Sequence, residues 1–318
     1  MPSAITKNCQ SPETLRSMAH AAFPDKQVMD IEELTAGMFN AAYHFTFDDG
    51  SCSILKIAAA TSEGLMSNEI CLMTAEVRAM EIARENGLPY VAKVQYHDTS
   101  RTLCSGEYFF MECMPGQSYA ALLGEMTDTQ RDAIDRQIGQ YQKSMTAIAG
   151  KAFGMLGDER SFAQLCDFVG YLLGHLLDDA QQRNVAIPVS REAFFAQLEK
   201  DRAVFDEVTA PSLVHWDMWP GNIFVQENEL SGIIDWERAM WTDPLMDDRF
   251  RRHSRKEAFL EGFGHPHLSQ SEMRRIYWYD IILYLTMMVE CYYRMYETDG
   301  QYHWAKPLLL DSWEALQA

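Results

Sequence analysis

The sequence has few of the features that mark secreted, membrane-spanning or metal-clustered proteins. Its seven cysteines are scattered and never form a Cys-x-x-Cys pair, which argues against a disulfide framework and against a zinc cluster. Residues 1–15 lack the apolar run of a secretory signal, and the most apolar late stretch, residues 277–293, is interrupted by Asp280 and Glu290. We therefore expect a cytoplasmic protein, in a reducing compartment, with no membrane span.

Basic residues are also scarce relative to acidic ones. The 318 residues contain 27 Lys and Arg against 46 Asp and Glu, a formal net charge of −19 at pH 7. Such a chain repels phosphate backbones and anionic lipid at long range, so a nucleic-acid partner is not expected. The acidic balance is compatible with a cationic small molecule as substrate. A protein partner remains unknown from the sequence.

Length and pattern indicate a globular protein with two lobes. The composition, 47% hydrophobic and 23% charged, is typical of globular domains, and the length exceeds the roughly 100 to 200 residues of one domain. Strand-like runs and a helix over residues 68–86 fill the first part of the chain, whereas later segments are mostly helical in pattern. We expect an α+β fold with an N-terminal lobe, residues 1–113, and a larger, mostly helical C-terminal lobe, residues 114–318.

A hairpin is predicted in the N-terminal lobe. Two strand-like runs, residues 43–47 and 52–57, flank Asp48-Asp49-Gly50, and Asp-Gly between alternating runs is a strong hairpin signal. A two-residue turn at Asp49 and Gly50 would pair Tyr43 with Lys56. The loop that contains Gly37 would then lie just beyond Lys56, at the open end of the hairpin.

A second hairpin is predicted near residues 213–237 (LVHWDMWPGNIFVQENELSGIIDWE). Residues 223–225 and 233–234 are short apolar runs, and the turn-forming QENELSG lies between them. Simple pairing places Asn222 and Asp235 together at the open end of this hairpin. An amide oxygen and a carboxylate in that position are suitable ligands for Mg²⁺.

A magnesium site with only two protein ligands is typical of nucleotide sites, because Mg²⁺ retains waters and substrate phosphates. The arrangement therefore predicts phosphoryl transfer. Asp217 lies five residues before Asn222, close enough to orient an attacking hydroxyl and accept its proton. His215 is too near the end of a strand for its position to indicate a proton-transfer role.

Residues 215–222 (HWDMWPGN) and 234–237 (IDWE) closely resemble the His-x-Asp-x-x-x-x-Asn and Asp-Trp-Glu motifs of the aminoglycoside phosphotransferase and choline kinase-like family of small-molecule kinases. That family has a protein-kinase-like bilobal fold. The resemblance implies that Asp217 is the catalytic base and that His215 is the structural histidine of the catalytic loop. It also implies that Asn222 and Asp235 hold Mg²⁺.

The resemblance extends to the rest of the nucleotide site. Residues 35–40 (TAGMFN), with Gly37 and Asn40, resemble the family's phosphate-covering loop. Lys56 resembles its phosphate-binding lysine, and Glu76 resembles the helix glutamate that pairs with this lysine. The resemblance thus implies that four residues contribute to ATP binding, namely Gly37, Asn40, Lys56 and Glu76.

Two further segments match the family. Residues 110–115 (FMECMP) resemble the linker whose backbone receives adenine, which implies cofactor-binding positions at Glu112 and Met114. Asp243-Pro244 matches a supporting turn after the metal aspartate. The family implies ATP-dependent transfer of the γ-phosphoryl group to a hydroxyl of a small acceptor, such as an aminoglycoside, an amino-alcohol or a sugar. Asp-Trp-Glu in place of Asp-Phe-Gly, and the lack of an Ala-Pro-Glu segment, argue against protein substrates.

Several residues have alternative interpretations. The three polar residues of the catalytic and metal set could merely cap a turn beside a core hairpin, and Lys56 could extend to water at a sheet edge or pair with Glu69 instead of Glu76. Glu237 follows a strand, where a carboxylate is usually solvated, and we favour that interpretation. We expect the basic run of residues 249–256 to be a solvated face.

The alternative function from a different class is a nucleotide-binding module of the same fold that acts without catalysis through a partner. Occupation of every polar position that phosphoryl transfer needs argues against it.

Overall fold

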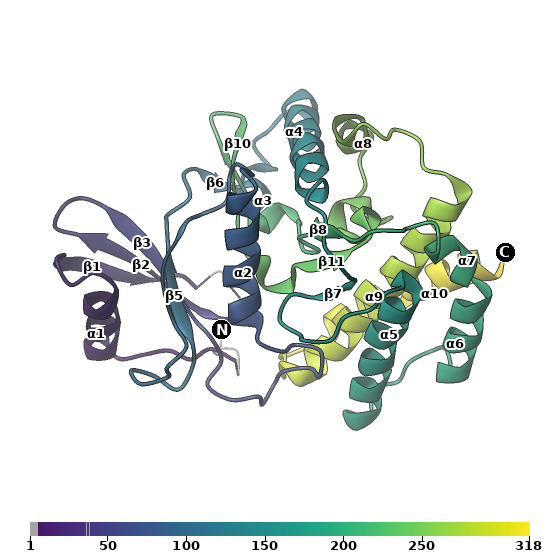
Figure 1. The fold of residues 1–318 in the computed structure, drawn as a ribbon, viewed down its shortest axis with the longest axis horizontal. Coiled ribbons are helices and arrows are strands. Elements are labelled where there is room, and N and C mark those ends of the chain that lie inside the picture. The colour runs from purple at the N-terminus through teal and green to yellow at the C-terminus, as the bar shows by residue number, and fades with distance from the viewer. Residues whose placement is uncertain (1–5, 36, 38) are drawn as a thin grey trace.

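The computed structural model describes residues 6–35, 37 and 39–318 and has two lobes. One lobe contains an antiparallel sheet in the order β1-β2-β3-β5-β4, and the other is mostly helical (Figure 1). The N-terminal lobe consists of α1 (Pro12–Ala22), β1 (Val28–Glu33), β2 (Ala41–Phe47), β3 (Cys52–Ile57), α2 (Leu72–Glu85), β4 (Val94–Asp98) and β5 (Tyr108–Met111).

The second part of the chain contains the remaining elements. Its strands are β6 (Gln117–Ser118), β7 (Gly154–Met155), β8 (Ser212–Val214), β9 (Ile223–Gln226), β10 (Glu229–Ile233) and β11 (Met240–Thr242). Its α-helices are α3 (Tyr119–Leu122), α4 (Asp128–Thr146), α5 (Leu165–Gln182), α6 (Arg191–Lys200), α7 (Arg202–Phe205), α8 (Glu257–Phe263), α9 (Gln270–Tyr293) and α10 (Gly300–Gln317). Short 3₁₀ turns are η1 (Pro220–Asn222), η2 (Trp236–Arg238), η3 (Pro244–Met246) and η4 (Asp248–Phe250).

The expected α+β architecture with a mostly helical second lobe is confirmed. The predicted boundary between residues 113 and 114 lies in the segment that connects β5 to β6, and the division at that position stays a prediction. Among the described residues, the structure contains no helix with the length and apolarity that a membrane crossing requires.

The first hairpin differs from the prediction by one residue. Ala42, not Tyr43, pairs with Lys56, because the loop has three residues instead of two. Gly50 has a φ of +79°, and a glycine in this conformation completes the three-residue hairpin loop that follows a type I turn. The backbone N–H of Phe47 donates to the carbonyl of Ser51, at 2.9 Å, and closes the loop. The shift decides which side chains share the face that carries Lys56.

The two faces of β2 have different environments. Tyr43, Phe45 and Phe47 are buried and pack with Leu15 and Met18 of α1 in a small core. Side chains alternate along a strand, so Ala42 and the other even-numbered residues of β2 lie on the opposite face, together with Lys56 of β3. Lys56 lies on this second face of the sheet, and its side chain extends toward α2.

Helix α2 begins later than the sequence pattern indicates. It starts at Leu72 instead of residue 68, because Cys71 has a φ of +49°, which α-helix does not accommodate. It ends before Gly87, whose φ of +75° terminates the helix as predicted. In Figure 1 α2 stands between the sheet and the helical lobe, and it contacts η2.

The second hairpin forms as predicted, with a shorter turn. β9 and β10 are antiparallel, and Glu227 and Asn228 form a two-residue turn with φ values of +52° and +63°, the conformation of a type I′ hairpin. A register shift follows Leu230. The N–H of Ile234 donates to the carbonyl of Asn222, at 3.0 Å, so the residues before and after the hairpin remain adjacent at its open end.

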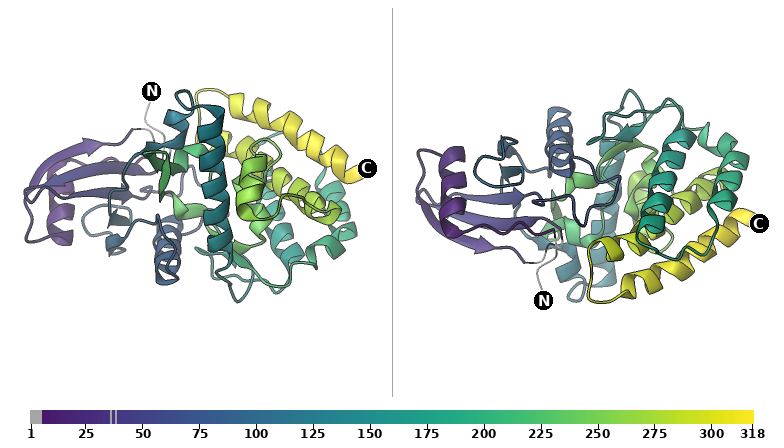
Figure 2. Two further views of the ribbon diagram at one scale, coloured as in Figure 1. Left: turned by 90° about the horizontal axis from the view of Figure 1, so that it is seen from above. Right: turned by 90° about the horizontal axis from the view of Figure 1, so that it is seen from below.

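The helical lobe is organised around α9. This helix has buried residues along its whole length, among them Trp278, Ile281 and Leu285, and it packs against α5 and α10. Ser269 and Glu272 form a capping box at its start, which satisfies two otherwise unpaired N–H groups. Figure 2 shows α9 and α10 side by side along the helical lobe.

Candidate active site

Lys56 is the point at which the sheet, α2 and the second hairpin meet. Its Nζ lies 2.6 Å from Oε1 of Glu76 on α2 and also forms an ion pair with Asp235, which follows the end of β10 by two residues. The Lys56 side chain is 7% exposed, and that of Glu76 is fully buried. Burial lowers the pKa of Lys56, but the carboxylates of Asp235 and Glu76 raise it more, so the amine is charged.

Glu69 does not contact Lys56. Its carboxylate pairs with Arg294, at 2.5 Å, and with Arg238, at 3.4 Å, and both guanidinium groups also contact Glu290. The Arg294 guanidinium lies 4.4 Å from the centre of the Phe39 ring. This network therefore joins the segment before α2 to the end of α9, whereas Glu76 serves Lys56.

His215 is fully buried directly after β8. Its Nε2 donates to the carbonyl of Ile234, at 2.9 Å, so its Nδ1 accepts from the N–H of Asp217, at 3.3 Å. Burial lowers the pKa of His215 to about 4, and its ring packs edge-on against Trp236. The neutral ring thus holds the segments that carry Asp217 and Asp235, a positioning role.

Asp217 and Asn222 lie on the segment between β8 and β9. Nδ2 of Asn222 donates to the carbonyl oxygen and to Oδ2 of Asp217, at 3.0 and 3.3 Å. The amide nitrogen is therefore occupied, and the Asn222 oxygen is the atom suited to a metal ion. Trp216, just before Asp217, has a φ of +74°, a strained conformation of the kind that clusters at functional sites.

The pKa of Asp217 is raised to about 7. Burial is the main cause; the guanidinium of Arg238 opposes it, and the carboxylates of Asp248, Asp235 and Glu290 add to it. A carboxylate with a pKa near neutrality is a better proton acceptor than an ordinary exposed aspartate. The site therefore contains a carboxylate whose basicity suits proton transfer.

Asp235 has a φ of +63° and precedes Trp236 and Glu237. Burial raises the pKa of Asp235, but the adjacent Lys56 lowers it further, so its pKa is lowered overall and the group is ionised. The pKa of Glu237 is raised to about 8, first by burial and then by the carboxylates of Asp235 and Glu76, against the effect of Lys56. Carboxylates therefore outnumber the lysine at this point.

Our interpretation of Glu237 as a solvated carboxylate is wrong. The residue is only partly exposed, and its Oε2 accepts a hydrogen bond of 2.8 Å from Nδ2 of Asn40. Asn40 lies 197 residues earlier in the chain, so no local pattern could have indicated this contact. The amide joins the predicted phosphate loop to the segment after Asp235.

The predicted phosphate loop is described only in part. Gly37 is exposed, and a Cβ atom on it would meet no heavy atom within 4 Å. Ala36 and Met38 lie outside the described residues. The proposed nucleotide contacts of Gly37 and Asn40 stay predictions.

The predicted adenine linker is fixed at both ends. The N–H of Glu112 donates to the carbonyl of Lys93, at 3.0 Å, and its carboxylate accepts from the N–H of Lys93, at 2.9 Å. Met114 lies close to Gly232, where an added Cβ would approach the Cβ of Met114 to 2.9 Å. Gly116 has a φ of +93°. The linker thus lies against β10, and the adenine-binding roles of Glu112 and Met114 stay predictions.

Sequence reasoning missed Arg238, which is the first cation to influence the pKa of Asp217. Its guanidinium stacks on Trp216, 5.2 Å from the ring centre, and pairs with Glu290 at 2.8 Å. Its only sequence signal is its place directly after Asp-Trp-Glu. The contact with Glu290 of α9 depends on tertiary packing.

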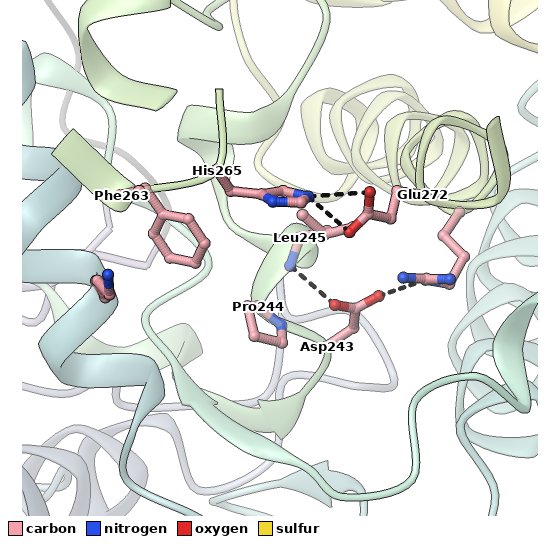
Figure 3. Close-up of a pocket in the computed structure, with 9 residues that line it drawn as sticks. Asp243, Pro244, Leu245, Phe263, His265 and Glu272 are labelled. Carbon is pink, nitrogen blue, oxygen red and sulfur yellow. Dashed lines mark hydrogen bonds and ion pairs between the residues drawn. The ribbon is translucent and has the colours of Figure 1, made fainter. Parts of the chain in front are cut away.

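Asp243 joins the turn that follows it to helix α9. Its carboxylate accepts from Nε of Arg275, at 2.8 Å, from the hydroxyl of Tyr279, at 2.7 Å, and from the N–H of Leu245, at 3.1 Å. A cavity of about 350 Å³ opens beside this turn, next to the hydrogen-bonded pair of His265 and Glu272 (Figure 3). None of the predicted catalytic, nucleotide or metal residues lines this cavity.

Comparison with solved structures shows the same fold in aminoglycoside phosphotransferases. The chain is 16% identical to a thermostable mutant of aminoglycoside phosphotransferase APH(4)-Ia in ternary complex with AMP-PNP and hygromycin B, with a TM-score of 0.67 over 95% of this chain and 98% of that chain. It is 14% identical to APH(2″)-IIa in its streptomycin–ATP ternary complex, with a TM-score of 0.60 over 98% and 97%. The protein-kinase-like fold that the resemblance implied is confirmed.

Comparison with curated protein sequences finds no match. The family model described as "Phosphotransferase enzyme family" matches residues 30–247. The matched region begins in β1 and includes Lys56, Glu76 and every residue of the two motifs around Asp217 and Asp235. Because this region covers more than half of the chain, the protein belongs to the phosphotransferase enzyme family.

Proposed function

We propose that the protein is an ATP-dependent kinase that transfers the γ-phosphoryl group to a hydroxyl of a small acceptor molecule. The observation that carries the proposal is the convergence of three elements on Lys56: β3 supplies the amine, α2 supplies Glu76, and the end of the second hairpin supplies Asp235. A charged lysine held between two carboxylates is suited to bind phosphate oxygens once one carboxylate turns to a metal ion.

The donor set fits Mg²⁺. The Asp235 carboxylate and the Asn222 amide oxygen are hard oxygen ligands, and the surrounding carboxylates exceed the local positive charge enough to raise the pKa of Glu237 to about 8. A divalent cation would offset this excess. Mg²⁺ held by Asn222 and Asp235 would neutralise charge on the phosphates, and Glu237 is placed to contribute to the same charge balance.

Asp217 is the proposed catalytic base. It orients the acceptor hydroxyl and takes its proton, while the hydroxyl oxygen forms a bond to the γ-phosphorus and the bond from that phosphorus to the bridging oxygen of ADP breaks. The hydrogen bond from Nδ2 of Asn222 to Oδ2 of Asp217 holds the carboxylate in place. A pKa of about 7 leaves the group substantially ionised at neutral pH and still able to accept a proton.

The acceptor is proposed as an aminoglycoside-like compound, an amino-alcohol or a sugar. Structures of the same fold hold hygromycin B or streptomycin together with a nucleotide. The acidic groups around Asp217, namely Asp248 and Glu290, and the net charge of −19 favour an acceptor that carries an amine. The cavity beside Trp216 and Arg238, at about 30 Å³, holds a water molecule but not a sugar ring.

The test measures ADP release from Mg-ATP with separate pools of aminoglycosides, amino-alcohols and sugars. We expect one pool to give turnover that falls at least about 100-fold in Asp217→Asn, the scale expected for a positioned general base. Asp206→Asn, at an exposed aspartate, is the matched control and should retain full turnover. Binding of Mg-AMP-PNP, followed by the melting temperature, should persist in Asp217→Asn.

Near-normal turnover of Asp217→Asn would contradict its role as base. Absence of turnover in all pools, combined with a nucleotide-induced rise in melting temperature, would favour the non-catalytic binding module. Absence of both would contradict the nucleotide site itself.

A further inference from the structure

Strand register brings together three side chains that are far apart in the sequence: His44 of β2, Cys52 at the start of β3 and Cys113 just after β5. His44 pairs with Ile54, which is two residues from Cys52 on the same strand, so His44 and Cys52 share one face as diagonal neighbours. Ile54 also pairs with Met111 on the other side. Continuing this register by two residues places Cys52 opposite Cys113.

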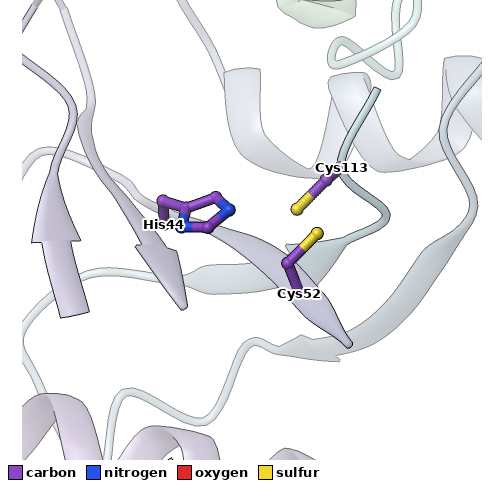
Figure 4. Close-up of side chains that lie close together, drawn as sticks. All are labelled: His44, Cys52 and Cys113. Atoms are coloured by element: carbon purple, nitrogen blue, oxygen red, sulfur yellow. The ribbon is translucent and has the colours of Figure 1, made fainter. Parts of the chain in front are cut away.

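The three side chains point toward one another in Figure 4. One nitrogen of His44 and the two Sγ atoms all lie within 4.8 Å of one another, and all three residues are partly buried. A tetrahedral Zn²⁺ with bonds of about 2.3 Å to sulfur and about 2.0 Å to nitrogen needs ligand atoms roughly 3.5 to 3.8 Å apart. A closure of at most about 1.3 Å, within the range of small side-chain rotations, would form the site.

The donor chemistry selects a soft metal ion. Thiolates and imidazole bind Zn²⁺ in Cys₂His sets, which leave a fourth position for water or another ligand, whereas Mg²⁺ prefers oxygen. We propose that His44, Cys52 and Cys113 form a second metal site, specific for Zn²⁺ and separate from the Asn222 and Asp235 pair. This site ties β2 and β3 to the linker.

The position of the site gives it a structural consequence. Cys113 lies between Glu112 and Met114, the linker residues predicted to receive adenine, while His44 and Cys52 lie on the face of the sheet that carries Lys56. A metal ion bound there restrains the segment that joins the two lobes. The cysteine spacing that argued against a zinc cluster considered only neighbours in sequence. The three ligands come from two strands, β2 and β3, and from the linker after β5.

The experiment uses the full chain, reduced and stripped of metal, with excess Mg²⁺ present to occupy oxygen sites. Zn²⁺ affinity is measured by competition with a chromophoric chelator, and Co²⁺ is added separately to look for thiolate-to-cobalt charge-transfer absorption. We expect one equivalent of Zn²⁺ to bind, with affinity at least about 100-fold weaker in Cys113→Ser, because loss of even an outer partner of a metal site costs about 10- to 100-fold. His44→Gln is the second ligand variant.

Cys104→Ser is the matched control, because Cys104 is a partly buried cysteine of the same lobe whose Sγ donates to the carbonyl of Gly106 instead. Its Zn²⁺ affinity and cobalt spectrum should equal those of the wild type. Equal affinity in wild type and Cys113→Ser, cobalt–thiolate absorption of undiminished intensity in Cys113→Ser, or a Cys52–Cys113 disulfide found by thiol counting and mass spectrometry before reduction would each overturn the proposal. Circular dichroism spectra that match across the variants would show that a loss of Zn²⁺ binding does not result from a loss of the fold.

Discussion

Arg238 and Glu290 lie near Asp217 and shift its pKa in opposite directions. The pH profile of the reaction can measure the two effects separately. The guanidinium of Arg238 lowers the pKa of Asp217, whereas the carboxylate of Glu290 raises it. The two residues pair with each other at 2.8 Å. Arg238→Gln should therefore move the acidic limb of activity to higher pH, and Glu290→Gln should move it to lower pH.

The size of the shift follows from the surroundings of Arg238. A cation beside an aspartate lowers its pKa by about 1 to 3 units, and the charge of Arg238 is shared with Glu69 and Glu290, so we expect the lower end of this range. A rise of about one unit corresponds to about 1.4 kcal/mol. With the wild-type pKa of Asp217 at about 7, the ionised fraction at pH 7 falls from about one half to about one tenth, a loss of roughly fivefold in rate.

The assay is kcat/KM for the acceptor at saturating Mg-ATP between pH 5.5 and 9.5, because this quantity reports the pKa values of the enzyme before it binds the acceptor. Ionised Asp217 is the active form, so a raised pKa moves the limb upward and a lowered pKa moves it downward. Titration of ATP itself is common to all variants. Arg191→Gln, at an arginine whose partner Asp178 is exposed, is the control and should leave the limb in place.

The reasoning is refuted if Arg238→Gln and Glu290→Gln shift the limb in the same direction, or if neither shifts it. Either result would mean that Asp217 is not the group whose ionisation limits the reaction.

Two further predictions concern the nucleotide site and the linker. Glu76→Gln should lower kcat/KM for ATP at least about tenfold, because Lys56 loses one of the two carboxylates that position it, and steady-state kinetics with an unchanged value would contradict this. Gly116→Ala should lower the free energy of unfolding by about 1 to 3 kcal/mol in urea titrations, since the residue has a φ of +93° and its Cβ would lie 2.3 Å from the carbonyl oxygen of Val225. Gly124→Ala, where an added Cβ meets no heavy atom within 4 Å, is the control, and equal stability of the two variants would contradict the steric argument.

Local patterns were sufficient for the parts of the site that lie close together in the chain. Asn222 and Asp235 flank a short hairpin, so any antiparallel pairing of the two apolar runs brings their backbones together, and the shorter turn found in the structure did not change this. Asp217 and Asn222 are five residues apart on one segment. The choice between Glu69 and Glu76 for Lys56 was harder, because both lie near the start of α2, and it depended on how that helix packs.

Loop conformation decided the register of the first hairpin. The pair Asp-Gly is compatible with two- and three-residue loops, and only the observed pairing of Thr46 with Cys52 and the hydrogen bond from Phe47 to Ser51 identify the longer loop. The register then determines the neighbours of Lys56, and it also places His44 and Cys52 on the same face.

Thus the sequence by itself determined the motif residues, through which the chain resembles its family, and the α+β architecture with a mostly helical second part, because these depend on motifs, periodicity and spacing within short segments. Only the tertiary structure decided the hydrogen bond between Asn40 and Glu237, the Arg238–Glu290 pair beside Asp217, and the meeting of His44, Cys52 and Cys113. These contacts join residues that are remote in the chain, and their formation depends on strand register and on the packing of α2 and α9, which no local pattern specifies.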